Sequence, residues 1–123
     1  MTRVFISGPI SGKPNLNKAA FAAEEEALLS EGNEVFNPHS ITDPNEETKA
    51  EWHVLANGDK EKVSENLWRY YMRSCVAEIP RCDEMRMLPD WQNSKGSVWE
   101  HRIAQMLGIP ITYCHVPDPE TKW

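Results

Sequence analysis

Short apolar runs alternate with longer segments of helical periodicity along this chain. The runs, bounded by glycine, proline or polar turn residues, predict strands over residues 3–7, 34–37, 82–88 and 109–114. The longer segments predict helices over residues 15–31, 64–79 and 95–107. Strands that alternate with helices predict an α/β fold, a flavodoxin- or Rossmann-like three-layer sandwich with a small parallel sheet of about four strands and helices on both faces.

Residues 38–63 interrupt this alternation with prolines, a glycine and many charges. Within them Asp43 and Pro44 have the order of an N-cap followed by a first-turn proline, and Asn57-Gly58 supplies a stop signal. We therefore expect a short helix over 44–56 inside an irregular, lid-like insertion.

Size and charge limit the number of domains and the kinds of partner. The chain has 123 residues, enough for one domain spanning 1–123 with a real core and too few for two ordinary domains. Its net charge is -6, whereas a surface that neutralises nucleic-acid phosphates needs a basic face. We expect a small-molecule ligand and no nucleic-acid polymer.

The cysteine pattern predicts a reducing compartment. Cys75, Cys82 and Cys114 are odd in number, lie in apolar segments and lack paired spacing, so we expect reduced core thiols in a cytoplasmic protein. No signal peptide or membrane-spanning run is apparent. His39 and His53 show no metal-ligand spacing, and no metal site is predicted.

Two loops are candidates for ligand contact. Residues 8–12 contain two glycines directly after the first predicted strand, and residues 89–96 follow the third. Ligands of parallel α/β sheets bind outside the carboxyl ends of the strands. Both loops leave that edge, and we expect them to converge there.

A polar segment over residues 91–100 brings an acidic residue, Glu100, to the start of the third predicted helix. We expect Glu100 in the first helical turn, where free backbone N–H groups and the helix dipole keep a carboxylate ionised near neutral pH. An ionised, positioned carboxylate is a potential nucleophile. The spacing of Ser97 and Glu100 is equally that of a capping box, and the segment alone does not decide between the two.

Two blocks of sequence resemble the nucleoside 2-deoxyribosyltransferase superfamily. The first is Phe5-Ile6-Ser7-Gly8-Pro9-Ile10-Ser11-Gly12, and the second is Leu88-Pro89-Asp90-Trp91-Gln92-Asn93-Ser94-Lys95-Gly96-Ser97-Val98-Trp99-Glu100. The chain is most similar to short bacterial and virus-encoded members of uncharacterised function, related to deoxynucleoside 5'-monophosphate N-glycosidases. The similarity covers nearly the whole chain in the right order, with residues 38–63 matching least.

This resemblance implies a retaining attack on the anomeric carbon of a nucleoside or nucleotide. Glu100 would be the catalytic residue and form a covalent glycosyl-enzyme, which water hydrolyses or a second base captures, without a cofactor. Lys95 or Arg73 could add positive charge, although each is equally a surface or helix-end cation. The residues expected to bind substrate are Ser7, Gly8, Pro9, Ile10, Ser11, Tyr71, Cys75, Asp90, Trp91, Ser94, Gly96 and Ser97.

One position departs from the family pattern. Relatives usually carry an aspartate two residues after Arg73, where it helps bind or protonate the base, and this chain has Cys75 there. A thiol neither orients a base as a carboxylate does nor protonates it efficiently. The apolar helical setting should raise the pKa of the Cys75 thiol, which argues against Cys75 as a nucleophile. Asp83 and Asp90 are the acidic alternatives nearest in sequence.

Three hypotheses follow from these observations. The first is an N-glycosidase or deoxyribosyltransferase-like enzyme. The second is a protein that binds or sequesters a nucleotide without cleaving it, and the third is a structural or partner-binding module. The resemblance also implies a homodimer or higher homo-oligomer, for which Trp91, Trp99 and Trp123 are candidate interface anchors.

Overall fold

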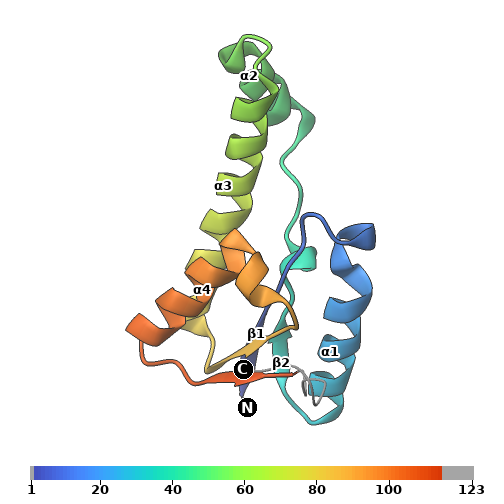
Figure 1. The fold of residues 1–123 in the computed structure, drawn as a ribbon, viewed down its shortest axis with the longest axis vertical. Coiled ribbons are helices and arrows are strands. Elements are labelled where there is room, and N and C mark those ends of the chain that lie inside the picture. Colours follow the sequence, from blue (N-terminus) through green and yellow to red (C-terminus); the bar gives the residue numbers. More distant parts are fainter. Residues whose placement is uncertain (1, 115–123) are drawn as a thin grey trace.

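The computed structural model describes residues 2–114, which form one parallel sheet with helices on both faces (Figure 1). The sheet has the strand order β2-β1-β3-β4. Its strands are β1 (Arg3–Ser7), β2 (Glu34–Phe36), β3 (Glu84–Met87) and β4 (Ile111–Tyr113). The helices are α1 (Lys18–Ser30), α2 (Glu46–Ala56), α3 (Lys60–Glu78) and α4 (Lys95–Met106). The predicted α/β three-layer sandwich is confirmed.

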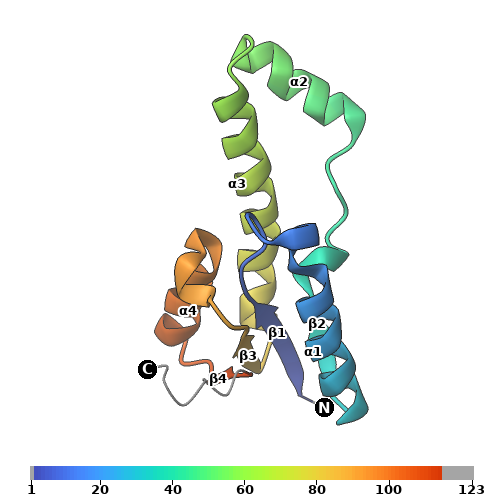
Figure 2. The ribbon, with the colours of Figure 1, turned by 45° about the vertical axis from the view of Figure 1, so that its right-hand side comes forward.

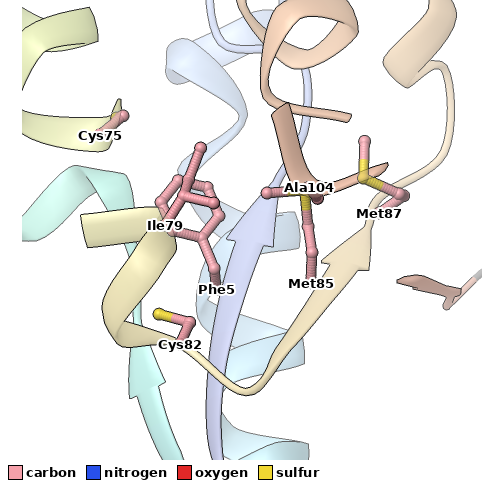
Figure 3. Close-up of a cluster of buried hydrophobic side chains, with 7 residues drawn as sticks. All are labelled: Phe5, Cys75, Ile79, Cys82, Met85, Met87 and Ala104. Carbon is pink, nitrogen blue, oxygen red and sulfur yellow. The ribbon is translucent and has the colours of Figure 1, made fainter. Parts of the chain in front are cut away.

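Alternating residues of β1 divide the core into two layers. Val4 and Ile6 pack with Phe21 of α1 on one face of the sheet, and Phe5 packs with Ile79 on the other. Figure 3 shows this second layer, in which Ile79 lies beside the Phe5 ring. Successive side chains of a strand point to opposite faces, so a strand with helices on both sides reads as a continuous apolar run.

The predicted element boundaries need several corrections. The third and fourth strands are shorter than predicted, and the first helix begins at Lys18 instead of Asn15. Residues 15–17 adopt left-handed backbone conformations, so they form a separate turn before α1. Asn17 makes no side-chain cap and instead donates from Nδ2 to the carbonyl of Pro9, at 2.9 Å.

The insertion forms a helical arm, defined here as α2 and the N-terminal half of α3 (residues 46–69). Asn45 caps α2 by accepting a hydrogen bond from the Thr48 amide, so the predicted cap at Asp43 is wrong. Asp59 caps α3, which therefore begins four residues before the predicted start at Ser64. The arm extends beyond the carboxyl edge of the sheet (Figure 2).

Candidate active site

A buried polar cluster lies at the carboxyl end of β1. Ser7, the last residue of β1, donates from Oγ to Oε1 of Glu100 in α4, at 2.6 Å. The hydroxyl oxygens of Ser7 and Ser97 are 3.1 Å apart. Ser7 is 0 % exposed, Ser97 1 % and Glu100 5 %. Polar groups this deeply buried need mutual hydrogen bonds, and here the partners come from a strand and a helix far apart in sequence.

α4 begins at Lys95, as predicted, but its N-cap is not the Ser97 of the alternative capping box. Ser94 is the N-cap, and its side chain accepts a hydrogen bond from the Ser97 amide at 3.3 Å. Ser97 is therefore the third helical residue, and Glu100 lies in the second turn. The predicted capping box between Ser97 and Glu100 is wrong, and Glu100 turns its carboxyl group toward β1 instead of toward the free N–H groups of the helix end.

Burial controls the ionisation of Glu100. Removal from water penalises the charged carboxylate and raises the pKa of Glu100 from 4.5 to about 7, against the opposing hydrogen bonds from Ser7 and Cys75. The expectation that Glu100 stays ionised near neutral pH is corrected by this shift. A carboxyl group with such a pKa exists in both protonation states near neutrality, which is typical of groups that take part in catalysis.

Cys75 faces this cluster from α3. The thiol is buried, and burial followed by the neighbouring Glu100 charge raises its pKa well above the usual range. The expected rise of the Cys75 pKa is therefore confirmed. A thiol in this state donates a hydrogen bond to Glu100 and does not act as a nucleophile.

Two glycines permit close packing around the cluster. A Cβ atom on Gly8 would lie 2.7 Å from the Leu88 Cβ, closer than such atoms approach. A Cβ atom on Gly96 would lie 3.3 Å from the Met72 sulfur. Because Gly8 has no side chain, the backbone after β1 can pack directly against Leu88, the residue that follows β3.

The loops after β1 and β3 converge as predicted. Lys13 Nζ and Asp90 Oδ2 form an ion pair at 2.7 Å, which joins the two loops beyond the buried cluster. Asp90 adopts a left-handed backbone conformation with φ of 66°. Asp90 is among the predicted site residues and Lys13 is not, because no local pattern marks a lysine whose partner is 77 positions away.

The remaining predicted residues lie around this edge with different contacts. Ile10 packs against the α1 layer of the core, and Ser11 is exposed. Trp91 stacks on His101 with ring centroids 4.2 Å apart. Tyr71 lies one helical turn from Cys75 and donates its hydroxyl hydrogen to Asp43 in the segment before α2.

The other charged candidates do not join the cluster. Lys95 Nζ lies 4.3 Å from the centroid of the Trp68 ring, and Arg73 is exposed on the side of α3 that lines a surface cavity of about 450 Å³. Asp83 accepts a hydrogen bond from the Arg3 amide at 2.9 Å, which is a structural role at the start of β1. Lys13 thus pairs with Asp90 across the two loops, whereas Lys95 contacts the Trp68 ring and Arg73 lines the surface cavity on α3.

Two further properties concern metals and membranes. Within residues 2–114 no group of three or more histidine, cysteine or acidic residues could hold a metal ion. None of the helices in the same range combines the length and the apolar character needed to cross a bilayer.

Together these features describe a parallel α/β protein with a buried carboxyl group at the carboxyl edge of its sheet. Residues 2–113 match the model of a family described as a domain of unknown function, DUF4406, and the chain belongs to that family. No curated protein matches the chain significantly.

Proposed function

We propose that the protein breaks the N-glycosidic bond of a nucleoside or deoxynucleoside 5'-monophosphate through a covalent glycosyl ester of Glu100. The observation that carries this proposal is the buried contact of Glu100 with Ser7 at the carboxyl edge of the sheet. That edge is where ligands of parallel α/β sheets bind. The resemblance of the blocks around Ser7 and Glu100 to nucleoside deoxyribosyltransferases supports the same assignment.

The chemistry requires Glu100 as a carboxylate. Ser7 orients Oε1, and an oxygen of Glu100 attacks the anomeric carbon while the bond from that carbon to the base breaks. The base leaves with the bonding electrons and takes up a proton. Water then attacks the anomeric carbon and releases sugar phosphate and free Glu100, or a second base attacks and forms a new nucleoside.

The local electrostatics suit this transition state. Positive charge develops on the sugar as the bond to the base weakens, and an adjacent buried carboxylate stabilises it more strongly than one in water. The same positive charge favours the ionised form of Glu100, whose pKa burial raises to about 7. Cys75 donates its hydrogen bond to Glu100, so the departing base takes its proton from water.

Base release tests the proposal directly. The wild type is incubated with a panel of nucleoside and deoxynucleoside monophosphates, and free base is measured chromatographically. Glu100→Ala should abolish release, and Ser7→Ala should reduce it, whereas Glu26→Gln, which changes an exposed carboxylate on α1, should leave it unchanged. Intact mass spectrometry of a rapidly quenched reaction should show a glycosyl adduct that Glu100→Ala lacks. No release from any member, with wild type and Glu100→Ala alike, would exclude the enzyme.

A second candidate function keeps the site without the chemistry. Cys75 stands where members of the resembled superfamily carry an aspartate, and its thiol is a poor proton donor to a base. This substitution supports the hypothesis that the protein binds or sequesters a nucleotide without cleaving it. Tight binding of a nucleotide that is recovered unchanged would support this alternative. Absence of both binding and cleavage would leave the structural or partner-binding module.

We also propose that the protein acts as a homodimer or higher oligomer in the cytoplasm. Trp99 is 48 % exposed on α4 and is available as an interface anchor. Trp91 is instead engaged by His101, and Trp123 lies outside the described residues. The three cysteines are free, which suits a reducing compartment. Analytical ultracentrifugation of wild type and Trp99→Ala tests the assembly, and a monomeric wild type would contradict it.

A further inference from the structure

Two surface cavities follow one side of α3 along most of its length. The first, of about 240 Å³, lies between α3 and the end of α2, and the second, of about 450 Å³, lies farther along α3. Arg69 lines both, so the cavities adjoin. Their α3 residues recur every three or four positions, which places them on one side of the helix. We call this surface the α3 face, and its residues are Lys62, Glu65, Asn66, Arg69, Met72, Arg73, Val76 and Ala77.

The C-terminal part of the α3 face carries unpaired positive charge beside exposed apolar side chains. α4 packs against it, because a Cβ atom on Gly96 would lie 3.3 Å from the Met72 sulfur. Trp99 follows Gly96 by one turn on the same side of α4, and Arg102 lies 5.7 Å from the centroid of the Trp99 ring. Among the described residues, neither Arg73 nor Arg102 has a carboxylate partner. We call this surface the basic end, and its residues are Arg73, Val76, Trp99 and Arg102.

The outer side of α2 combines exposed apolar side chains with negative charge. Val54 and Leu55 are 76 % and 79 % exposed. Glu47 and Glu51 are exposed on the same side of the helix, and within residues 2–114 neither forms an ion pair. The opposite side of α2 packs on α3 through Trp52. We call this surface the acidic end, and its residues are Glu47, Glu51, Val54 and Leu55.

The two ends are placed so that two copies of the chain complement each other. The arm extends past the sheet, and no part of residues 2–114 covers its outer side (Figure 2). Leu55 lines the first cavity with Lys62, and Val76 lines the second. Lys62 and Val76 are about 20 Å apart along the helix axis, at a rise of about 1.5 Å per residue. A two-fold axis near Arg69 therefore brings the acidic end of each copy onto the basic end of the other.

We propose that two copies of the chain pair antiparallel along the α3 face, with the acidic end of each copy on the basic end of the other. This inference rests on the proposed homo-oligomer and identifies its interface. The exposed apolar side chains of both ends lose their contact with water in such a dimer. The opposite charges around them favour the antiparallel over the parallel arrangement. Because the same surface is used by both copies, the contact closes with two chains.

Sedimentation equilibrium of the full chain and of two charge-reversal variants tests this inference. Arg73→Glu/Arg102→Glu and Glu47→Arg/Glu51→Arg each place like charges opposite one another at both contacts of the dimer. Each should raise the dimer Kd by about a hundredfold or more, because juxtaposed like charges strongly disfavour association. The wild-type Kd should rise with added NaCl, since salt screens the exposed charges.

An equimolar mixture of the two variants gives the decisive measurement. In the mixed dimer one contact has its original charges and the other has both charges reversed, so both contacts are attractive. The mixture should therefore recover a dimer with a Kd within about tenfold of the wild-type value. A variant that had failed to fold would not recover in this way.

The matched control reverses two exposed acids on the other side of the sheet. Glu26→Arg/Glu31→Arg, on α1 and at its C-cap, changes the net charge as much as Glu47→Arg/Glu51→Arg does. α1 packs on the face of the sheet opposite to α3 and α4, so this variant should dimerise as the wild type does. It should not recover a dimer when mixed with Arg73→Glu/Arg102→Glu, because one contact of that mixed dimer keeps like charges.

The outcomes separate this interface from the proposed oligomer. If both charge-reversal variants dimerise as tightly as the wild type, the homo-oligomer stands and this interface is wrong. Variants that are monomeric alone and remain monomeric when mixed would overturn the antiparallel pairing. A monomeric wild type would overturn both the interface and the oligomer, and the glycosidase would still be judged by release of base.

Discussion

Replacement of Glu100 by glutamine should change the pH dependence of folding stability. The folded protein binds a proton at Glu100 with a pKa of about 7, whereas the ordinary value is 4.5. At about 1.4 kcal/mol per pKa unit, this difference corresponds to roughly 3 kcal/mol. Because the folded pKa is raised, this stabilisation is fully present below the unfolded pKa and is lost as the pH rises through about 7.

The Glu100→Gln variant lacks this titration. Its amide resembles the protonated acid in shape and charge, so the two proteins should have similar free energies of unfolding at about pH 4 and diverge above it. At about pH 8.5 the variant should be more stable than the wild type by up to about 3 kcal/mol, since it does not bury a charge. The variant would at the same time lose the proposed activity, as expected where a functional group is retained at a cost in stability.

Urea denaturation at about pH 4, 6, 7 and 8.5 measures this difference, because the other titrating groups are common to both proteins and cancel. Ser7→Ala provides a companion variant. This substitution removes a hydrogen bond that lowers the pKa of Glu100, so the pKa should rise further. The pH at which the folded protein loses the Glu100 contribution to its stability should therefore be higher in Ser7→Ala than in the wild type. A difference between wild type and Glu100→Gln that stays constant with pH, or that favours the wild type at high pH, would refute the reasoning.

Three other predictions concern the same edge of the sheet. The kcat/KM for base release should rise with pH and level off above about 7, because only the carboxylate form of Glu100 attacks. A kcat/KM that does not change between about pH 5 and 9 would contradict this. Gly8→Ala should lower the free energy of unfolding by about 1–3 kcal/mol, since its Cβ would lie 2.7 Å from the Leu88 Cβ, and unchanged stability in urea would show that Leu88 moves freely. Ser94→Ala should cost about 1 kcal/mol through loss of the α4 cap, whereas Ser94→Asp should retain most of the stability, and equal melting temperatures for the two would argue against the cap.

The helix and strand limits that depend on a few neighbouring residues were predicted best from the sequence. The apolar run at β1 has the predicted limits, and α2 ends at Ala56, directly before the predicted stop signal at Asn57-Gly58. Errors arose where two local signals compete. Ser94 and Ser97 are both possible caps three residues apart, and Asp59 and Ser64 both stand where α3 could begin. Such choices depend on which helical face meets the sheet, and the local pattern does not contain that information.

The sequence by itself determined the alternation of strands and helices, and with it the parallel sheet and the edge at which its loops meet. The resemblance also marked Ser7 and Glu100 as candidates, with Glu100 expected in the first turn of the helix. Only the tertiary structure decided their chemistry, because Ser7 and Glu100 are 93 positions apart and their contact and burial set the pKa of the carboxyl group. The same holds for Lys13 and Asp90, whose ion pair exists only once the two loops are brought together. Periodicity is a property of neighbouring residues, whereas desolvation and charge pairing depend on the whole fold.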